Sequence, residues 1–134
     1  MDLASHQTLS GVVELDRLSM EKMLRDAEKV VIVEFYTTGC PICQQLAPMY
    51  EQLSREMDNA VFARIDAEAN IDIALQYGVL ATPTFKFFCG SRFLGEIVGD
   101  TNATIMRNTV RDLIRHKSCP SGSRNVSYEM DGYG

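Results

Sequence analysis

Two cysteines, Cys40 and Cys43, stand three residues apart in the run TTGCPIC and carry the strongest chemical signal in the chain. Thr37 to Gly39 interrupt the apolar pattern before them, and Pro41 suits the first turn of a helix, so we expect Cys40 at a helix N-terminus. Unpaired backbone N–H groups and the positive end of the helix dipole stabilise a thiolate there. Cys43 lies about one helical turn further on, within reach for a disulfide. The pattern therefore predicts thiol chemistry.

A second candidate is Glu34, which lies inside the apolar run VVIVEFY from Val30 to Tyr36. Such a run of β-branched and aromatic residues is typical of a strand buried on both faces. A carboxyl group in these surroundings has a raised pKa and can move a proton near neutral pH. The alternatives are a solvent-facing position at a strand edge or an ion pair with a lysine such as Lys86. The neighbours Val33 and Phe35 argue against exposure.

The cysteine pair has two other interpretations. A C-x-x-C pair can be half of a zinc site, which needs two further Cys or His ligands at a compatible spacing. Cys89 and Cys119 are single, and His6 and His116 lie in the flanks, so we expect no metal. Buried cysteines can also be inert, but the proline after Cys40 argues against that.

We expect Cys89 and Cys119 to be bystanders, the first in a hairpin turn and the second in a C-terminal tail. The alternative is that an exposed thiol forms a regulatory or intermolecular disulfide.

The elements that position these residues follow from hydrophobic periodicity and turn residues. Strands are expected at 12–15, 30–36, 61–66, 84–88 and 93–98, and helices at 16–29, 41–57, 71–77 and 103–117. The first three strands and their helices form a β-α-β-α-β order, which right-handed crossovers make parallel. The short connection 89–92 demands an antiparallel hairpin. The sequence thus predicts an α/β fold with a mixed central sheet and helices on both faces.

Several details of the helices are also predicted. Ile42 is expected on the inward face of helix 41–57 together with Leu46, and Pro48 is expected to kink that helix. Asp100 or Thr101 is expected to cap the last helix.

Composition sets outer bounds on function. The chain of 134 residues is 46% hydrophobic and reads as one domain, 11–117, between a lead-in, 1–10, and a flexible tail, 118–134. A net charge of -5 argues against nucleic-acid binding and against attraction to acidic membranes. No apolar run approaches the roughly 20 residues of a membrane span. The absence of a signal-peptide pattern and the four cysteines, only two of them in a motif, favour a cytoplasmic, reducing compartment.

The spacing of further features resembles the thioredoxin family. Pro48 stands five residues past Cys43, where thioredoxins have a helix-kinking proline. The run ATPTF, from Ala81 to Phe85, resembles the family's cis-proline loop, and Gly99 matches the glycine that closes the last strand. The resemblance covers residues 11 to 117.

This resemblance implies a thioredoxin fold and a thiol-disulfide oxidoreductase that reduces protein disulfides. Cys40 would be the nucleophile, Cys43 the resolving cysteine, and Glu34 a proton shuttle in place of the family's buried aspartate. A cis bond before Pro83 would bring Thr82 against the cysteines to offer main-chain hydrogen bonds. The implied substrate-binding set is Gly39, Pro41, Ile42, Thr82, Pro83 and Gly99.

The implied partners are disulfide-containing proteins and a flavoprotein or ferredoxin-linked reductase, with no cofactor, nucleic acid or membrane. We expect a monomer.

The chain also departs from the family pattern. It has no Trp, whereas thioredoxins usually have Trp before the first cysteine, and it has Pro41 and Ile42 where they have Gly-Pro. The sequence C-P-x-C also resembles glutaredoxins. Three interpretations therefore stay open: a disulfide reductase, a glutaredoxin-like or oxidase/isomerase role, and a non-catalytic binding module.

Overall fold

The computed structural model of the protein describes residues 11–116 and 119. In this part of the chain the elements follow in the order β1 (Val13–Leu15), α2 (Arg17–Asp26), β2 (Val30–Tyr36), α3 (Pro41–Glu56), β3 (Ala60–Asp66), α4 (Ile71–Gln76), β4 (Thr84–Cys89), β5 (Arg92–Val98) and α5 (Ala103–His116). None of the helices described is long and apolar enough to cross a membrane. The predicted lead-in, and the predicted tail apart from Cys119, lie outside the described residues.

The strands form one sheet in the order β1-β3-β2-β4-β5. β3 pairs parallel with both β1 and β2, because the α2 and α3 crossovers return the chain to the same end of the sheet. β4 runs antiparallel to β2 and to β5. The predicted parallel unit followed by an antiparallel hairpin is confirmed.

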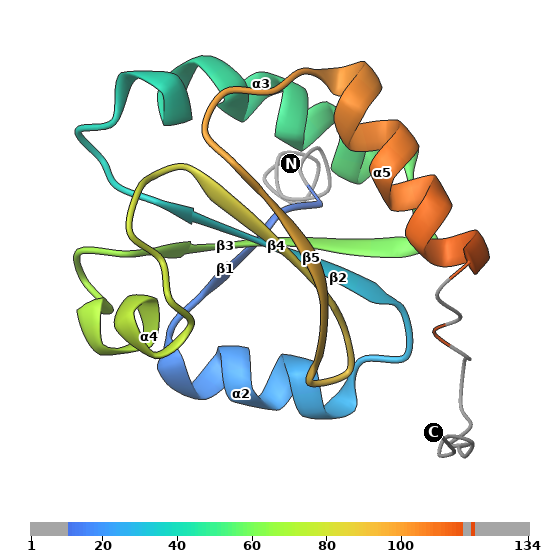
Figure 1. Ribbon diagram of the computed structural model, residues 1–134, viewed down its shortest axis with the longest axis horizontal. Helices are drawn as coiled ribbons and strands as arrows, with labels where there is room; N and C mark the ends of the chain where they lie inside the picture. Colours follow the sequence, from blue (N-terminus) through green and yellow to red (C-terminus); the bar gives the residue numbers. More distant parts are fainter. Residues whose placement is uncertain (1–10, 117–118, 120–134) are drawn as a thin grey trace, which may run out of the picture.

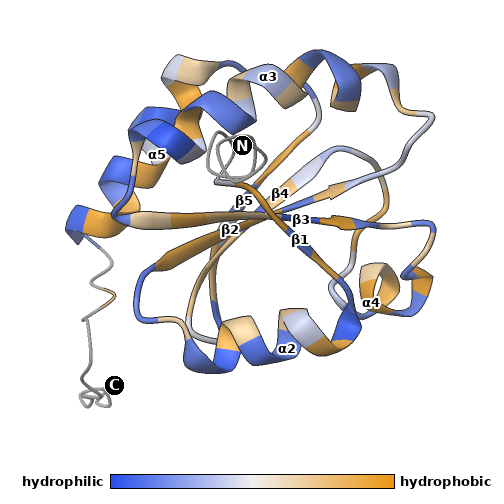
Figure 2. Cartoon of the chain, turned by 180° about the vertical axis from the view of Figure 1, so that it is seen from behind, coloured by the Kyte–Doolittle hydropathy of each residue, from blue (hydrophilic) through white to orange (hydrophobic). Residues whose placement is uncertain are grey.

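Two hydrophobic cores lie on opposite faces of this sheet. Side chains alternate along β2, so Val31 and Val33 join the core under α2 and α4, while Val30 and Ile32 join the core under α3 and α5. Figure 1 shows α3 and α5 on one side of the sheet and α2 and α4 on the other. Figure 2 shows that the central strands are largely hydrophobic, whereas hydrophilic residues alternate with hydrophobic ones along the helices. Glu34, two residues after Ile32, is therefore on the α3 side.

Most predicted bounds are within one residue of the observed ones, but the end of α2 and the cap of α5 differ for local reasons. α2 ends at Asp26, three residues before the predicted end, because Ala27 is already extended at ψ 140° and leads into β2. The cap of α5 is neither Asp100 nor Thr101. The Asn102 side chain accepts a hydrogen bond from the Ile105 N–H at 2.9 Å instead. Asparagine one residue before the helix is well suited to this role.

Candidate active site

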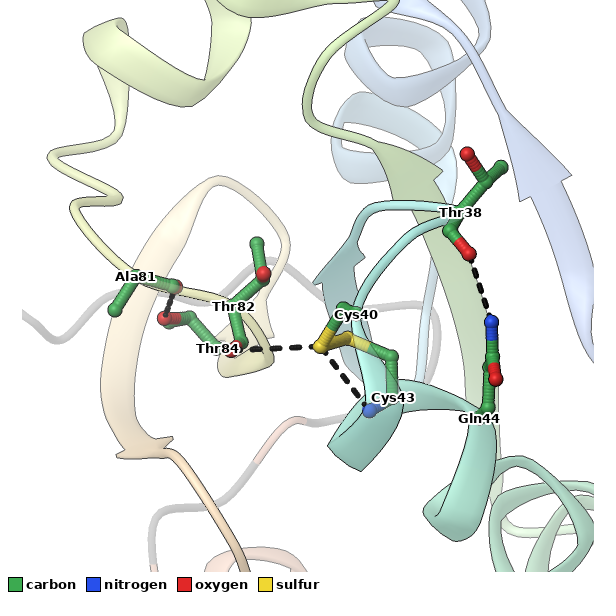
Figure 3. The surroundings of a disulfide bond; sticks show 7 residues. All are labelled: Thr38, Cys40, Cys43, Gln44, Ala81, Thr82 and Thr84. Atoms are coloured by element: carbon green, nitrogen blue, oxygen red, sulfur yellow. Dashed lines mark hydrogen bonds between the residues drawn. A yellow bond between two sulfur atoms is a disulfide. The ribbon is translucent and has the colours of Figure 1, made fainter.

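The two motif cysteines lie at the junction of β2 and α3. Cys40 is the N-cap residue of α3, and Pro41 is its first residue. The two cysteines form a disulfide with Cα atoms 5.2 Å apart, and the Cys43 N–H donates a hydrogen bond to Cys40 Sγ at 3.1 Å (Figure 3). After reduction, the same N–H and the helix N-terminus would stabilise a Cys40 thiolate. The predicted disulfide-forming pair at a helix N-terminus is confirmed.

The first turn of α3 presents Pro41 and Ile42 to solvent beside this disulfide. The expectation that Ile42 faces inward is wrong, since 36% of the residue is exposed. Cys43, at 5% exposed, takes the inward position of that turn, and Cys40, at 9%, is the more accessible cysteine. This order of access suits Cys40 as the attacking sulfur and Cys43 as the resolving one.

A loop from a distant part of the sequence closes over the cysteines. The Thr82-Pro83 peptide bond is cis, as predicted. The Thr82 carbonyl oxygen lies 3.6 Å from Cys40 Sγ (Figure 3). A disulfide sulfur carries no proton, so this contact becomes an S–H···O hydrogen bond only when Cys40 is a thiol.

Hydrogen bonds hold this loop on both sides. The Gly99 N–H donates to the Pro83 carbonyl oxygen at 2.8 Å, which brings the end of β5 to the loop. The Thr84 hydroxyl donates to the Ala81 carbonyl oxygen at 2.6 Å (Figure 3). Thr82 thus lies beside Cys40, as the resemblance implied, and Gly99 lies beside Pro83. Gly39, which directly precedes Cys40, is exposed.

Glu34 is buried behind the cysteine pair, with only 3% of the residue exposed. Burial raises the pKa of its carboxyl group from 4.5 to about 7, an effect that the charge of Arg64 partly offsets. Glu34 and Cys43 line the same cavity of about 210 Å³, together with Tyr36, Thr37, Thr38, Gln44, Ala47 and Arg64. This volume is ample for water, which needs roughly 10–15 Å³. The cavity therefore has room for water beside both groups.

A polar cluster lies at the wall of this cavity. Arg64 lies beside Glu34 in the parallel register of β3 and β2. Its Nε donates to Glu14 Oε1 at 2.8 Å, and the Tyr36 hydroxyl donates to Glu14 Oε2 at 2.7 Å. The Arg64 guanidinium also lies 4.2 Å from the centre of the Tyr36 ring. The sequence alone did not single out Arg64, because only the strand register reveals that it neighbours Glu34.

The alternative prediction, an ion pair between Glu34 and Lys86, is wrong. Lys86 pairs with Glu96 of β5, not with Glu34. In the register of β2 and β4, Lys86 stands opposite Val33, whereas Phe85 stands opposite Glu34. Residues opposite each other share a face of the sheet, so Lys86 points to the face away from Glu34.

The bystander interpretation of the other two cysteines is also wrong. Cys89, at the end of β4, forms a disulfide with Cys119, and their Cα atoms are 5.4 Å apart. Sequence reasoning missed this pair because the two residues stand 30 positions apart with no motif between them. The prediction of a reducing compartment depended partly on two unpaired cysteines, and this pairing removes that support.

Residues 11–116 and 119 hold no group of three or more His, Cys, Asp or Glu side chains suited to a metal ion.

The family model for thioredoxin matches residues 11–112. The chain belongs to the thioredoxin family. The matched residues include both motif cysteines, Glu34, the Thr82-Pro83 loop and Gly99, so the family match covers every part of the site.

Relatives within the thioredoxin family fall into two groups by length. A protein disulfide-isomerase of Schizosaccharomyces pombe is 42% identical over 82 residues, which cover 59% of this chain but 23% of that protein. A thioredoxin of Bos taurus is 34% identical over 87 residues, covering 65% of this chain and 82% of that protein. The chain thus spans about a quarter of the isomerase relative and most of the thioredoxin.

Solved structures agree with this assignment. A mutant thioredoxin from Halobacterium salinarum superposes with a TM-score of 0.71 at 27% identity, covering 75% of this chain and 88% of that one. The mixed five-stranded sheet with helices on both faces is thus a thioredoxin fold.

Proposed function

We propose that the chain reduces protein disulfides by dithiol-disulfide exchange. The Cys40 thiolate attacks one sulfur of a substrate disulfide, forms a mixed disulfide with it and releases the other sulfur as a thiolate. The Cys43 thiolate then attacks Cys40 Sγ, which restores the Cys40–Cys43 disulfide and releases the second substrate sulfur. Two electrons pass to the substrate, whose two sulfurs take up two protons.

The observation that carries this proposal is the environment of Cys40. Its sulfur accepts the Cys43 N–H at the start of α3 and faces the Thr82 carbonyl oxygen at 3.6 Å. An extended substrate segment that pairs its main chain with Thr82 would place its own disulfide at this sulfur. Main-chain capture of this kind tolerates many sequences. We assign Gly39, Pro41, Ile42, Pro83 and Gly99 to substrate binding around this contact, with Pro83 buried beneath it.

We assign Glu34 to the proton transfer of the second half-reaction. Cys43 must lose its proton before it attacks, and Glu34 lines the same cavity with a pKa of about 7. A base with a pKa near the working pH transfers protons most effectively. Because the glutamate side chain is buried, the cavity is the route by which this proton would pass between the carboxylate and the thiol.

Turnover of a disulfide-bonded protein such as insulin, with dithiothreitol as electron donor, tests the proposal. We expect Cys40→Ser to abolish reduction and Cys43→Ser to accumulate a mixed disulfide with the substrate, because the resolving thiol is missing. The matched control is Cys89→Ser with Cys119→Ser, which changes two cysteines outside the site and should retain turnover. Full activity of Cys40→Ser would refute the mechanism.

A second candidate, disulfide isomerisation or oxidation, is favoured by the 42% identity to a protein disulfide-isomerase. The equilibrium reduction potential of the Cys40/Cys43 pair separates the two. A value near or below the glutathione pool, about -220 to -260 mV, supports the reductase, whereas about -120 to -180 mV supports oxidation or shuffling. Turnover that requires glutathione would instead indicate a glutaredoxin-like role.

The partners of this reaction also belong to the proposal. An unidentified reductase, either a flavoprotein or ferredoxin-linked, would restore the dithiol, and the exchange itself needs no cofactor. We expect the protein to work as a monomer in the cytoplasm, without nucleic acid or membrane. If a Cys40→Ser, Cys43→Ser variant kept a full biological role, a binding module would replace the enzyme.

A further inference from the structure

The Cys89–Cys119 disulfide joins the end of β4 to a residue just after α5. Cys89 ends β4, and Cys119 follows the end of α5 by three residues. The closed ring spans 30 residues and contains the whole β5 strand and the whole α5 helix. The disulfide therefore ties the chain beyond α5 to the sheet.

This disulfide is partly buried and packs against the hydrophobic core. Both cysteines are half-buried, and Cys119 packs against the core under α3 and α5. A cavity of about 230 Å³ lies beside it, lined by Glu28, Lys29, Val30, Asn59, Ile114 and Cys119. The Lys29 ammonium group donates to the Asp58 carbonyl oxygen at 2.7 Å, which fixes the loop before β3 along this wall. Cys119 thus occupies a defined place against β2 and α5.

The disulfide lies at the opposite end of the sheet from the active site. Cys89 pairs with Val30 at the start of β2, whereas Cys40 follows the end of that strand at Tyr36. Six residues of strand at about 3.3 Å each separate the two ends by roughly 20 Å. Figure 1 shows the same arrangement, with α5 ending where β2 begins and α3 beginning at the far side. Cys40 therefore cannot exchange with Cys89 or Cys119 of its own molecule.

The two elements that carry the disulfide are each held in the fold by their own packing. β4 is held between β2 and β5, and α5 is anchored in the core by Met106, Val110 and Leu113. If the disulfide is reduced, its thiols remain neighbours, so the second step of reoxidation is intramolecular and strongly favoured. A pair held in this way resists reduction by a monothiol, because the mixed disulfide closes again before a second monothiol attacks.

We propose that Cys89 and Cys119 form a second redox site, a clamp that stays closed while the Cys40/Cys43 pair is reduced and oxidised. The clamp holds Cys119, three residues after the end of α5, against the end of β4. It closes when the two thiols lose two protons and two electrons to a low-molecular-mass disulfide such as glutathione disulfide, which becomes two thiols. A dithiol such as dithiothreitol opens it by the reverse exchange and becomes a cyclic disulfide.

The experiment uses the full chain with Cys40→Ser and Cys43→Ser, so that only the second pair can react. The protein is equilibrated in a large excess of reduced over oxidised glutathione, denatured, alkylated and weighed by mass spectrometry. We expect no alkylated cysteine and a peptide that links residues 89 and 119 in a monomer. After dithiothreitol, both cysteines should be alkylated. Two free thiols in the glutathione buffer, or a disulfide-linked dimer, would overturn the proposal.

Hydrogen exchange tests the clamp itself on the same variant before and after dithiothreitol. Opening should raise the exchange rates of the amides in the last turn of α5, Leu113 to His116, by about tenfold or more, because that turn loses its covalent anchor. The amides of α3 are the internal reference and should not change. Equal rates in the two states would show that the disulfide clamps nothing.

These results are independent of the proposed disulfide reduction at Cys40. A protein with no reductase activity but a closed Cys89–Cys119 pair would refute the proposed function and leave the clamp intact. A protein that reduces disulfides but has free thiols at Cys89 and Cys119 would refute the clamp and leave the proposed function intact.

Discussion

At the scale of single residues, the site contains a carboxyl group whose burial disfavours its ionised form. Glu34 is buried on the α3 face of the central strand, and burial raises its pKa to about 7. A carboxylate that resists ionisation weakens the folded state whenever the pH is high enough to ionise it in the unfolded chain. Function and stability therefore oppose each other at this residue.

Glu34→Gln should raise the free energy of unfolding of the protein and lower its rate of disulfide reduction. Below pH 4.5 the glutamate is protonated in both states, so the variant gains little; the gain grows between pH 4.5 and 7 and then levels off. The difference between a pKa of about 7 and the ordinary 4.5 corresponds to at most about 3 kcal/mol. Urea unfolding at pH 4.5 and pH 8 measures this gain.

The same variant should lower turnover by up to about a hundredfold, because glutamine cannot accept the Cys43 proton. Glu68→Gln, a change of the same kind at an exposed residue, is the control for both measurements. A stability gain that did not depend on pH would contradict the argument from burial.

Arg64 should control the pKa of the Glu34 carboxyl group. Its positive charge lowers the pKa of Glu34, so Arg64→Gln should raise that pKa above about 7 and move the pH dependence of turnover to higher pH. An NMR titration of the Glu34 carboxyl carbon measures the shift directly. Arg64→Lys keeps the charge and should move the pKa less. Arg107→Gln removes a guanidinium paired with Glu56 on another part of the surface and should not move it.

At the scale of elements, α3 must be fixed to the sheet if Cys40 is to face the Thr82 loop. Tyr50 supplies a polar anchor within the core. Its hydroxyl lies 2.7 Å from the Ala63 carbonyl oxygen and 3.1 Å from that of Ile32, and so joins α3 to β3 and β2. Only 2% of the residue is exposed.

Tyr50→Phe keeps the aromatic packing but removes this hydrogen bond, so we expect a loss of about 1–2 kcal/mol in the free energy of unfolding. Thermal or urea unfolding at neutral pH measures the loss. Tyr77→Phe is the matched control, because the Tyr77 ring packs on the other face, against Phe35 and Phe88. An equal effect of the two substitutions would show that the hydroxyl of Tyr50 anchors nothing.

At the scale of the whole molecule, the site exists only where three distant parts of the chain converge. Cys40 starts α3, Thr82 and Pro83 precede β4, and Gly99 follows β5. The Gly99 N–H holds the Pro83 carbonyl oxygen at 2.8 Å with a φ of 89°, in the left-handed region that favours glycine. A substitution at Gly99 should therefore alter the position of the Thr82-Pro83 loop, which lies 16 residues earlier in the sequence.

Gly99→Ala meets open space for its methyl group but keeps the unfavourable φ. We expect a loss of about 1–2 kcal/mol in stability and weaker binding of substrate, seen as a higher KM. Gly39→Ala is the control for stability, since it also meets open space and its φ lies outside the left-handed region. Its stability should stay within about 0.5 kcal/mol of the natural protein. If both variants lose the same stability, backbone strain is not the cause.

The sequence by itself determined the fold class, the bounds of β2 and the redox pair. These depend on local patterns: the apolar run Val30 to Tyr36, the breakers Thr37 to Gly39, and cysteines one helical turn apart. The resemblance to thioredoxins added the cis bond before Pro83 and the place of Thr82 beside the cysteines. Local interactions and family spacing were sufficient because each feature lies within a few residues or recurs at a fixed spacing.

Only the tertiary structure decided which residues meet across the sheet. The parallel register of β2 and β3 places Arg64 beside Glu34, and the antiparallel register of β4 turns Lys86 to the other face. The pairing of Cys89 with Cys119 likewise depends on where α5 ends relative to β4. These contacts join residues 30 or more positions apart or depend on a strand register. Periodicity along one element carries no information about that register, because it is set by the packing of the elements against one another.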